Sequence, residues 1–191
     1  MANICTTTYY MVGERESLDR LVSALDKMDN SNNSMLCYLA EAFGIDYKAE
    51  GICVRGQVTY HDWFADKEEL LVITDTAWSA CHDLFYAINE VLGDTLSISY
   101  QEVEPGCEIF CVHDEWDYFP DVCIAYMGGE PFDGHCEEPF RSLSDAINYW
   151  CKAIGEVRDK SLSKRAYIDY INNYKYEDAD TYFRIYEFEE V

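Results

Sequence analysis

The chain has 191 residues, which suits one domain or one domain with an appendage. Apolar residues make up 49% of it, enough for a packed core, whereas 37 acidic residues outnumber 14 basic ones and give a formal net charge of −23. Because such a chain repels phosphate backbones, direct nucleic-acid binding is disfavoured; the charge favours basic partners or serves solubility alone.

No apolar leader opens the chain, and no run approaches the roughly 20 apolar residues that a membrane span needs. The nine cysteines are irregularly spaced and include no Cys-x-x-Cys pair. We therefore expect a cytoplasmic protein without membrane contact, in which reduced cysteines serve mostly as small core residues.

The first residues predict a strand followed by two helices. Residues 4–12 are β-branched and aromatic, which predicts a strand that Gly13 ends. Apolar residues three and four apart predict a helix over residues 14–28. A shorter helix is predicted from Ser34, as its N-cap, to Gly44.

Two strands and a helix follow. Alternation predicts a strand over residues 51–60, and residues 70–74 predict another after an acidic turn at residues 61–69. An apolar stripe then predicts a helix that is capped by Ser79 and ended by Gly93.

The central stretch predicts an antiparallel meander. Strands are expected at residues 96–101, 107–113 and 121–126, because apolar and polar residues alternate there or because the residues favour strands. Glu104-Pro105-Gly106 suits the first tight turn, and residues 114–117 are acidic enough for the second.

The last part predicts a long loop at residues 128–140 and a helix from Ser142 to Gly155. A further helix is expected at residues 162–170 and a final strand at residues 181–188.

The order of these elements predicts a single α+β domain over residues 1–191. Its first half follows the ferredoxin-like, or split βαβ, order: an antiparallel sheet with helices on one face. Residues 1–130 would form this core with the added β-meander, and residues 131–191 a C-terminal elaboration of helices plus a strand.

Several short motifs resemble those of a known family. The chain opens with Met1-Ala2-Asn3-Ile4-Cys5, and Thr76-Ala77-Trp78-Ser79 precedes a predicted helix. Leu96-Ser97-Ile98-Ser99-Tyr100 and Glu102-x-Glu104-Pro105-Gly106 follow. Over roughly the first 130 residues the chain resembles the YubB-type ferredoxin-like family of bacterial plasmids, phages and other mobile elements. The chain has Ala80-Cys81 where members usually have Pro-Pro.

This resemblance implies a fold and a mobile-element setting. It implies no catalytic residues, because the activity of the family is not established.

The candidate binding residues lie in and around the predicted meander. Paired carboxylates on one strand face can serve acid–base chemistry, although in so acidic a chain such pairs also arise by chance. Acidic residues interleaved with aromatic ones can bind a basic protein through ion pairs and Arg stacking. The residues concerned are Glu102, Glu104, Asp114, Glu115, Trp116, Asp117 and Tyr118.

Cysteine and histidine patterns give weaker signals. Cys107, Cys111 and His113 share a predicted strand face, but positions four apart on a strand are too far apart for one ion. Cys81 and His82 are adjacent on a predicted helix and point in different directions. We therefore predict no catalytic residues, no metal and no cofactor.

The sequence thus favours a non-catalytic interaction module whose acidic, aromatic surface binds a basic protein. A sharper form of this hypothesis is DNA mimicry, in which carboxylates imitate the phosphates of a duplex and occupy a nucleic-acid-binding host protein, as an anti-defence factor would. A small metal-binding or cysteine-dependent enzyme and a self-associating structural accessory protein remain as alternatives.

Overall fold

The computed structural model describes residues 3–64, 68–132 and 134–191 and confirms the α+β class. The chain divides into two compact units. The N-terminal unit reaches Tyr118 and also includes Glu190 and Val191; the C-terminal unit comprises Phe119–Glu189. Outside the described residues lie Met1 and Ala2 of the family motif, residues 65–67 of the predicted acidic turn and residue 133 of the predicted loop.

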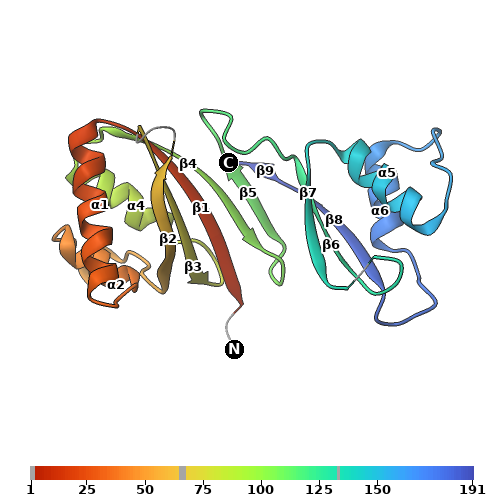
Figure 1. Ribbon diagram of the computed structural model, residues 1–191, viewed down its shortest axis with the longest axis horizontal. Coiled ribbons are helices and arrows are strands. Elements are labelled where there is room, and N and C mark those ends of the chain that lie inside the picture. Colours follow the sequence, from red (N-terminus) through yellow and green to blue (C-terminus); the bar gives the residue numbers. More distant parts are fainter. Residues whose placement is uncertain (1–2, 65–67, 133) are drawn as a thin grey trace. The chain divides into compact units, whose positions relative to one another are not determined.

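The N-terminal unit contains a sheet in the order β2-β3-β1-β4-β5-β9, in which the neighbouring strands from β2 to β5 are antiparallel (Figure 1). Its strands are β1 (Ile4–Gly13), β2 (Gly56–Phe64), β3 (Glu69–Ala77), β4 (Leu96–Glu104) and β5 (Ile109–His113), and the sheet ends with β9 (Glu189–Glu190), of which Glu190 belongs to this unit. Its helices are α1 (Arg15–Asn30), α2 (Leu36–Ala42), α3 (Tyr47–Glu50) and α4 (His82–Val91).

Alternation along the strands decides which residues form the core of this unit. On β1, every second residue from Cys5 to Met11 is buried, whereas the residues between them lie on the opposite face. Helices α1, α2 and α4 cover the buried face (Figure 1) and contribute apolar residues such as Leu21, Leu39 and Phe85 to one core. We call this the helix face and the opposite side of the sheet the second face.

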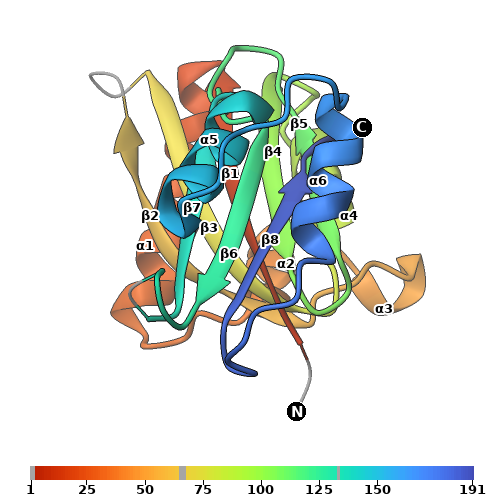
Figure 2. The same ribbon diagram turned by 90° about the vertical axis from the view of Figure 1, so that its right-hand side faces the viewer.

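The C-terminal unit contains a smaller antiparallel sheet in the order β7-β6-β8. Its elements are β6 (Cys123–Gly128), β7 (Cys136–Phe140), α5 (Leu143–Ile154), α6 (Lys164–Asn172) and β8 (Tyr182–Glu187). Figure 2 shows α5 and α6 over one face of this sheet, where they enclose a separate core around Trp150.

Local signals set the helix ends in this unit. The Ser142 and Ser163 side chains accept hydrogen bonds from backbone N–H groups three residues on, as the N-caps of α5 and α6. Gly155 ends α5 with a φ of 75°, a conformation that glycine adopts without strain. The predicted helices and the final strand of this part are therefore confirmed, with α6 and β8 shifted by one or two residues at their ends.

The predicted meander is wrong. Strands β4 and β5 form an antiparallel hairpin, with Tyr100 opposite His113, but β6 pairs with β7 and β8 instead of β5. Strand β7 lies within the stretch predicted to be a loop. Its residues are mostly exposed and it is an edge strand, so Pro139 is tolerated there and no alternation marks it.

Other boundaries also differ from the sequence prediction. The sequence places the start of its C-terminal elaboration at residue 131, whereas the two compact units, each with its own core, divide between Tyr118 and Phe119. That the whole chain is a single domain stays a prediction. Helix α4 has Cys81 as its N-cap residue, not Ser79, and β5 begins at Ile109 because Cys107 and Glu108 belong to a turn.

Among the described residues, none of the helices has the length and apolar character that crossing a membrane requires.

Candidate functional site

The acidic segment after β5, residues 114–117, is hydrogen bonded to two serines of β4 on the second face of the sheet. The Glu115 backbone N–H donates to Ser99 Oγ at 3.1 Å, and the Ser97 hydroxyl donates to Glu115 Oε2 at 2.6 Å. The Trp116 indole N–H donates to the same Ser97 hydroxyl at 2.9 Å, and its backbone N–H donates to Asp114 at 3.2 Å. The segment is therefore held in one conformation although it is a turn.

Aromatic rings continue this arrangement across the sheet. Tyr118 stacks on Tyr10 of β1, with ring centroids 4.4 Å apart, and Phe64 of β2 meets Tyr10 edge-on at 5.5 Å. Burial raises the pKa of both tyrosines, and the Glu69 carboxylate raises them further, through a hydrogen bond in the case of Tyr118. One oxygen of Glu69 is buried without a hydrogen-bond partner among the described residues.

We call this group the acidic–aromatic surface. Trp116 is 58% exposed and Phe64 48% exposed, although the Trp116 indole N–H is hydrogen bonded. The surface comprises Tyr10, Phe64, Glu69, Asp114, Glu115, Trp116, Asp117 and Tyr118.

Sequence reasoning found the turn residues of this surface but missed Tyr10, Phe64 and Glu69. Alternation alone places Tyr10 on the face of β1 that does not carry Tyr9, so the sequence did indicate that Tyr10 lies on the second face. The strand order and register bring Phe64 and Glu69 beside it, since Phe64 pairs with Glu69 and Glu69 with Val12. Those pairings could not be derived from local patterns.

Glu102 and Glu104 do not belong to this surface, which corrects the prediction. They share a strand face, as expected, but it is the helix face, and the two residues are only 7% and 2% exposed. The Glu104 carboxylate accepts hydrogen bonds from the backbone N–H groups of Gly106 and Cys107, so it fixes the turn between β4 and β5. Neither carboxylate is free to contact a partner.

The Glu102 carboxylate is the centre of a buried polar network. Its Oε1 accepts from the Ala80 backbone N–H at 2.7 Å and from the Cys5 thiol at 3.3 Å. Its Oε2 lies 3.2 Å from His82 Nε2, and His82 Nδ1 lies 3.2 Å from the Tyr9 hydroxyl. Since an ionised carboxylate only accepts, His82 Nε2 carries a proton and donates it to Glu102.

The network shifts the pKa values of Glu102 and Cys5. Burial by itself raises the pKa of Glu102, but hydrogen bonds from His82, Ala80 and Cys5 outweigh burial and lower it below its ordinary value. Burial, together with the Glu102 charge, raises the pKa of the Cys5 thiol to about 12. The carboxylate is therefore ionised at neutral pH, and the thiol beside it stays protonated.

This chemistry stabilises the fold but supplies no nucleophile. The Cys5 thiol donates to the Glu102 carboxylate, and burial together with that negative charge keeps the thiol protonated and unreactive. Cys81 is buried as well, and burial together with Cys53 raises its pKa to about 12. The arrangement gives no support to a cysteine-dependent enzyme centred on Cys5 or Cys81.

The remaining histidines also face groups other than cysteines. His61 lies 3.1 Å from Asp26, His113 lies 2.8 Å from the Val191 carbonyl oxygen, and His135 lies 3.0 Å from the Tyr182 hydroxyl. In the part of the chain that the structure describes, no group of three or more His, Cys, Asp or Glu side chains is placed to hold a metal ion.

The pKa of the Cys53 thiol is shifted in the opposite direction to those of Cys5 and Cys81. Burial raises its pKa, but hydrogen bonds from Arg55 and Cys81 and the charge of Arg55 outweigh burial, and the net pKa is lowered.

We expect iodoacetamide at pH 7 to alkylate Cys53 faster than Cys5 or Cys81, because the thiolate is the reactive form. Mass spectrometry of timed digests measures this, with exposed Cys136 as the accessibility control. Equal rates for Cys53 and Cys5 would contradict the assignment.

Comparisons with known proteins add no identification. The sequence matches no protein-family model, and a search of curated proteins gives no significant match. The resemblance to the YubB-type family therefore stays a prediction.

Proposed function

We propose that the protein is a non-catalytic interaction module that binds a basic protein through the acidic–aromatic surface. One observation carries the proposal: Trp116 is fixed by hydrogen bonds from its indole and backbone N–H groups and is still more than half exposed. A large apolar ring held in solvent contributes little to the core of its own fold. Such a ring is suited to contacting a binding partner.

The geometry lowers the entropy that binding must overcome. A side chain that is already ordered loses less freedom on association than a mobile one, for which ordering costs about 0.5–1.5 kcal/mol. Trp is also among the residues that most often dominate binding energy, and Arg stacks well on its face. The ring and its neighbouring carboxylates, Glu115 and Asp117, together suit an arginine side chain.

The charge of the whole chain supports the same class of partner. At a net charge of −23, the protein attracts basic proteins from a distance and increases their association rate at low salt. It repels nucleic acids for the same reason. We therefore propose a basic protein partner and no direct contact with nucleic acid or membrane, in a cytoplasmic setting.

We also propose that the N-terminal unit is ferredoxin-like and related to the YubB-type family. Support comes from the strand order β2-β3-β1-β4 with antiparallel neighbours, and from α1 and α4 as the connections that lead from β1 toward β2 and from β3 to β4. The split βαβ order leads us to expect such a strand arrangement, which supports this part of the proposal. A mobile-element setting would then make a host nucleic-acid-binding protein a reasonable partner, and mimicry of duplex phosphates the sharper form of the proposal.

A pull-down with matched variants tests the proposal. The binding variant carries Asp114→Asn, Glu115→Gln and Asp117→Asn, and a second variant carries Trp116→Ala. The charge control carries Asp83→Asn, Glu90→Gln and Asp94→Asn, three exposed acids elsewhere in the N-terminal unit, and Trp78→Ala is the aromatic control. The amide changes keep the hydrogen-bond acceptors of the turn, so the fold is preserved.

We expect wild type and both controls to retain the same basic protein from host lysate and to release it as salt increases. The triple amide variant should lose it, and Trp116→Ala should weaken binding about 30-fold, since such an anchor is worth about 2 kcal/mol. Retention by every variant, or salt-insensitive retention, would contradict the proposal. Mimicry further requires that the purified partner release duplex DNA when the protein is added.

A further inference from the structure

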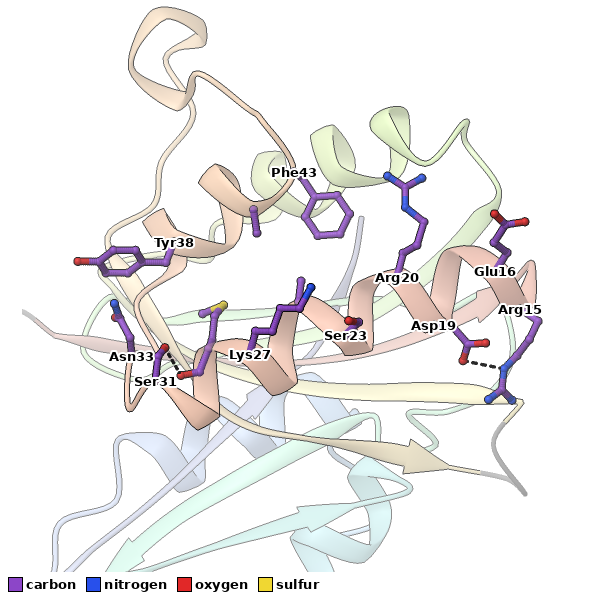
Figure 3. A pocket seen from close by; sticks show the side chains of 13 residues that line it. Arg15, Glu16, Asp19, Arg20, Ser23, Lys27, Ser31, Asn33, Tyr38 and Phe43 are labelled. Carbon is purple, nitrogen blue, oxygen red and sulfur yellow. Dashed lines mark hydrogen bonds and ion pairs between the residues drawn. The ribbon is translucent and has the colours of Figure 1, made fainter.

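A groove of about 860 Å³ runs between α1 and the segment that contains α2, away from the acidic–aromatic surface residues. Its volume lies within the range of small-molecule sites. Figure 3 shows Tyr38 and Phe43 on one side of the groove and Arg20 and Lys27, from α1, on the other.

Helical spacing explains why these α1 side chains line one groove. Ala24, Lys27 and Met28 lie four, seven and eight positions after Arg20 on α1, so the four residues share one face of the helix. Ala24 and Met28 are buried and form an apolar floor, while Arg20 and Lys27 are exposed at its edge. The Cα atoms of Arg20 and Lys27 are separated by about 10.5 Å along the helix axis.

The groove is basic although the molecule is acidic. Three basic and two acidic residues line it, so its formal charge is +1, against −23 for the whole chain. Arg15 is engaged with Asp19 at 2.9 Å and stacks over Trp63 at 4.4 Å. Arg20 and Lys27, in contrast, form no ion pair with any residue that the structure describes.

We propose that this groove binds a small organic anion that combines one or two negative charges with an apolar body. The anionic group lies between Arg20 and Lys27, and the apolar body rests on Met28, Phe43 and Tyr38. A highly charged acidic macromolecule is disfavoured as the occupant, because the net charge of −23 repels it. A ligand with few charges meets little of this repulsion and gains the local contacts.

A pair of fluorescent probes tests both halves of the proposal. 8-Anilinonaphthalene-1-sulfonate carries one negative charge on an apolar ring system, and N-phenyl-1-naphthylamine has the same rings without the sulfonate. The full chain is titrated with each probe at fixed ionic strength, with stoichiometry from calorimetry. The groove variant is Arg20→Gln with Lys27→Gln, and the control is Lys160→Gln with Lys175→Gln, which changes the net charge equally at exposed sites of the C-terminal unit.

We expect one sulfonate probe per chain, bound about tenfold more weakly by the groove variant and unchanged in the control. The uncharged probe should bind both double variants equally. Tyr38→Ser should weaken both probes, because it removes exposed apolar surface from the groove. Equal binding of the sulfonate to all variants, or equal losses in groove variant and control, overturns the proposal. Absence of saturable sulfonate binding to wild type overturns it as well.

Discussion

Replacing Glu102 by alanine is expected to lower the free energy of unfolding by about 3 kcal/mol, because removal of one partner from a buried charged network leaves the others unsatisfied. The Ala80 backbone N–H, the Cys5 thiol and His82 Nε2 would all lose their acceptor. Cys5 lies on β1, Ala80 lies just before α4, and His82 is the first residue of α4. Since Glu102 lies on β4, the change weakens the junction of β1, β4 and α4.

Urea unfolding followed by circular dichroism measures this effect. The matched control is Glu90→Ala, an exposed glutamate on α4, which should change stability by less than about 0.5 kcal/mol. A midpoint for Glu102→Ala equal to that of the control would show that the network does not stabilise the fold.

The same carboxylate makes stability depend on pH. Its pKa is lower in the folded chain than its ordinary value of 4.5, so the ionised form stabilises the fold above that pH. This contribution is lost as pH falls from about 4.5 through the lowered folded pKa. Glu102→Gln cannot ionise, so the stability difference between wild type and this variant should shrink as the solution is acidified. A constant difference from pH 7 down to pH 3 would contradict the ionisation that we assign.

The parts of the fold that were predictable rest on local patterns. Alternation places Tyr9 and Met11 on one face of β1 and Tyr10 on the other whatever the neighbouring strands are. Helices α5 and α6 follow from apolar stripes that begin near capping serines. These signals need only a few consecutive residues, so the sequence shows them directly.

Pairing between distant segments was not predictable in this way. Strand β6 follows β5 along the chain, yet it pairs with β8, whose partner residues lie about 60 positions further on. Adjacent strands in sequence are usually neighbours in space, and the meander prediction relied on that tendency. No local pattern distinguishes the two arrangements, because Cys123 and Ala125 are suited to either sheet.

The surroundings of the candidate site residues also depend on distant segments that local patterns do not reveal. The charge of Glu102 suggested a solvated residue, and its position on β4 was read correctly as sharing a face with Glu104. Its burial depends on His82, 20 positions away, and on Cys5, 97 positions away, which together compensate the lost hydration. Trp116 and Tyr118 were predictable as candidates, but their fixed positions depend on Ser97 and Tyr10.

Replacing Trp150 by alanine is expected to destabilise the C-terminal unit by about 4 kcal/mol, as large-to-small changes at buried aromatic residues do. Trp150 is fully buried at the centre of the core that α5 and α6 enclose. Its indole N–H donates to the Tyr176 hydroxyl at 2.7 Å, and Tyr174 packs edge-on against its ring at 5.1 Å. The substitution removes this hydrogen bond and leaves a cavity that the surrounding rings cannot fill without moving.

Hydrogen exchange with mass spectrometry locates the loss, since peptides from residues 119–189 should exchange faster in Trp150→Ala than in wild type. Trp116→Ala is the matched control: it is the same chemical change at an exposed ring of the N-terminal unit, and it should leave the protection of residues 119–189 unchanged. Unchanged protection in Trp150→Ala would mean that this core does not hold the C-terminal unit together. Faster exchange in residues 3–118 as well would show that the two cores unfold as one cooperative unit in spite of their separation in sequence.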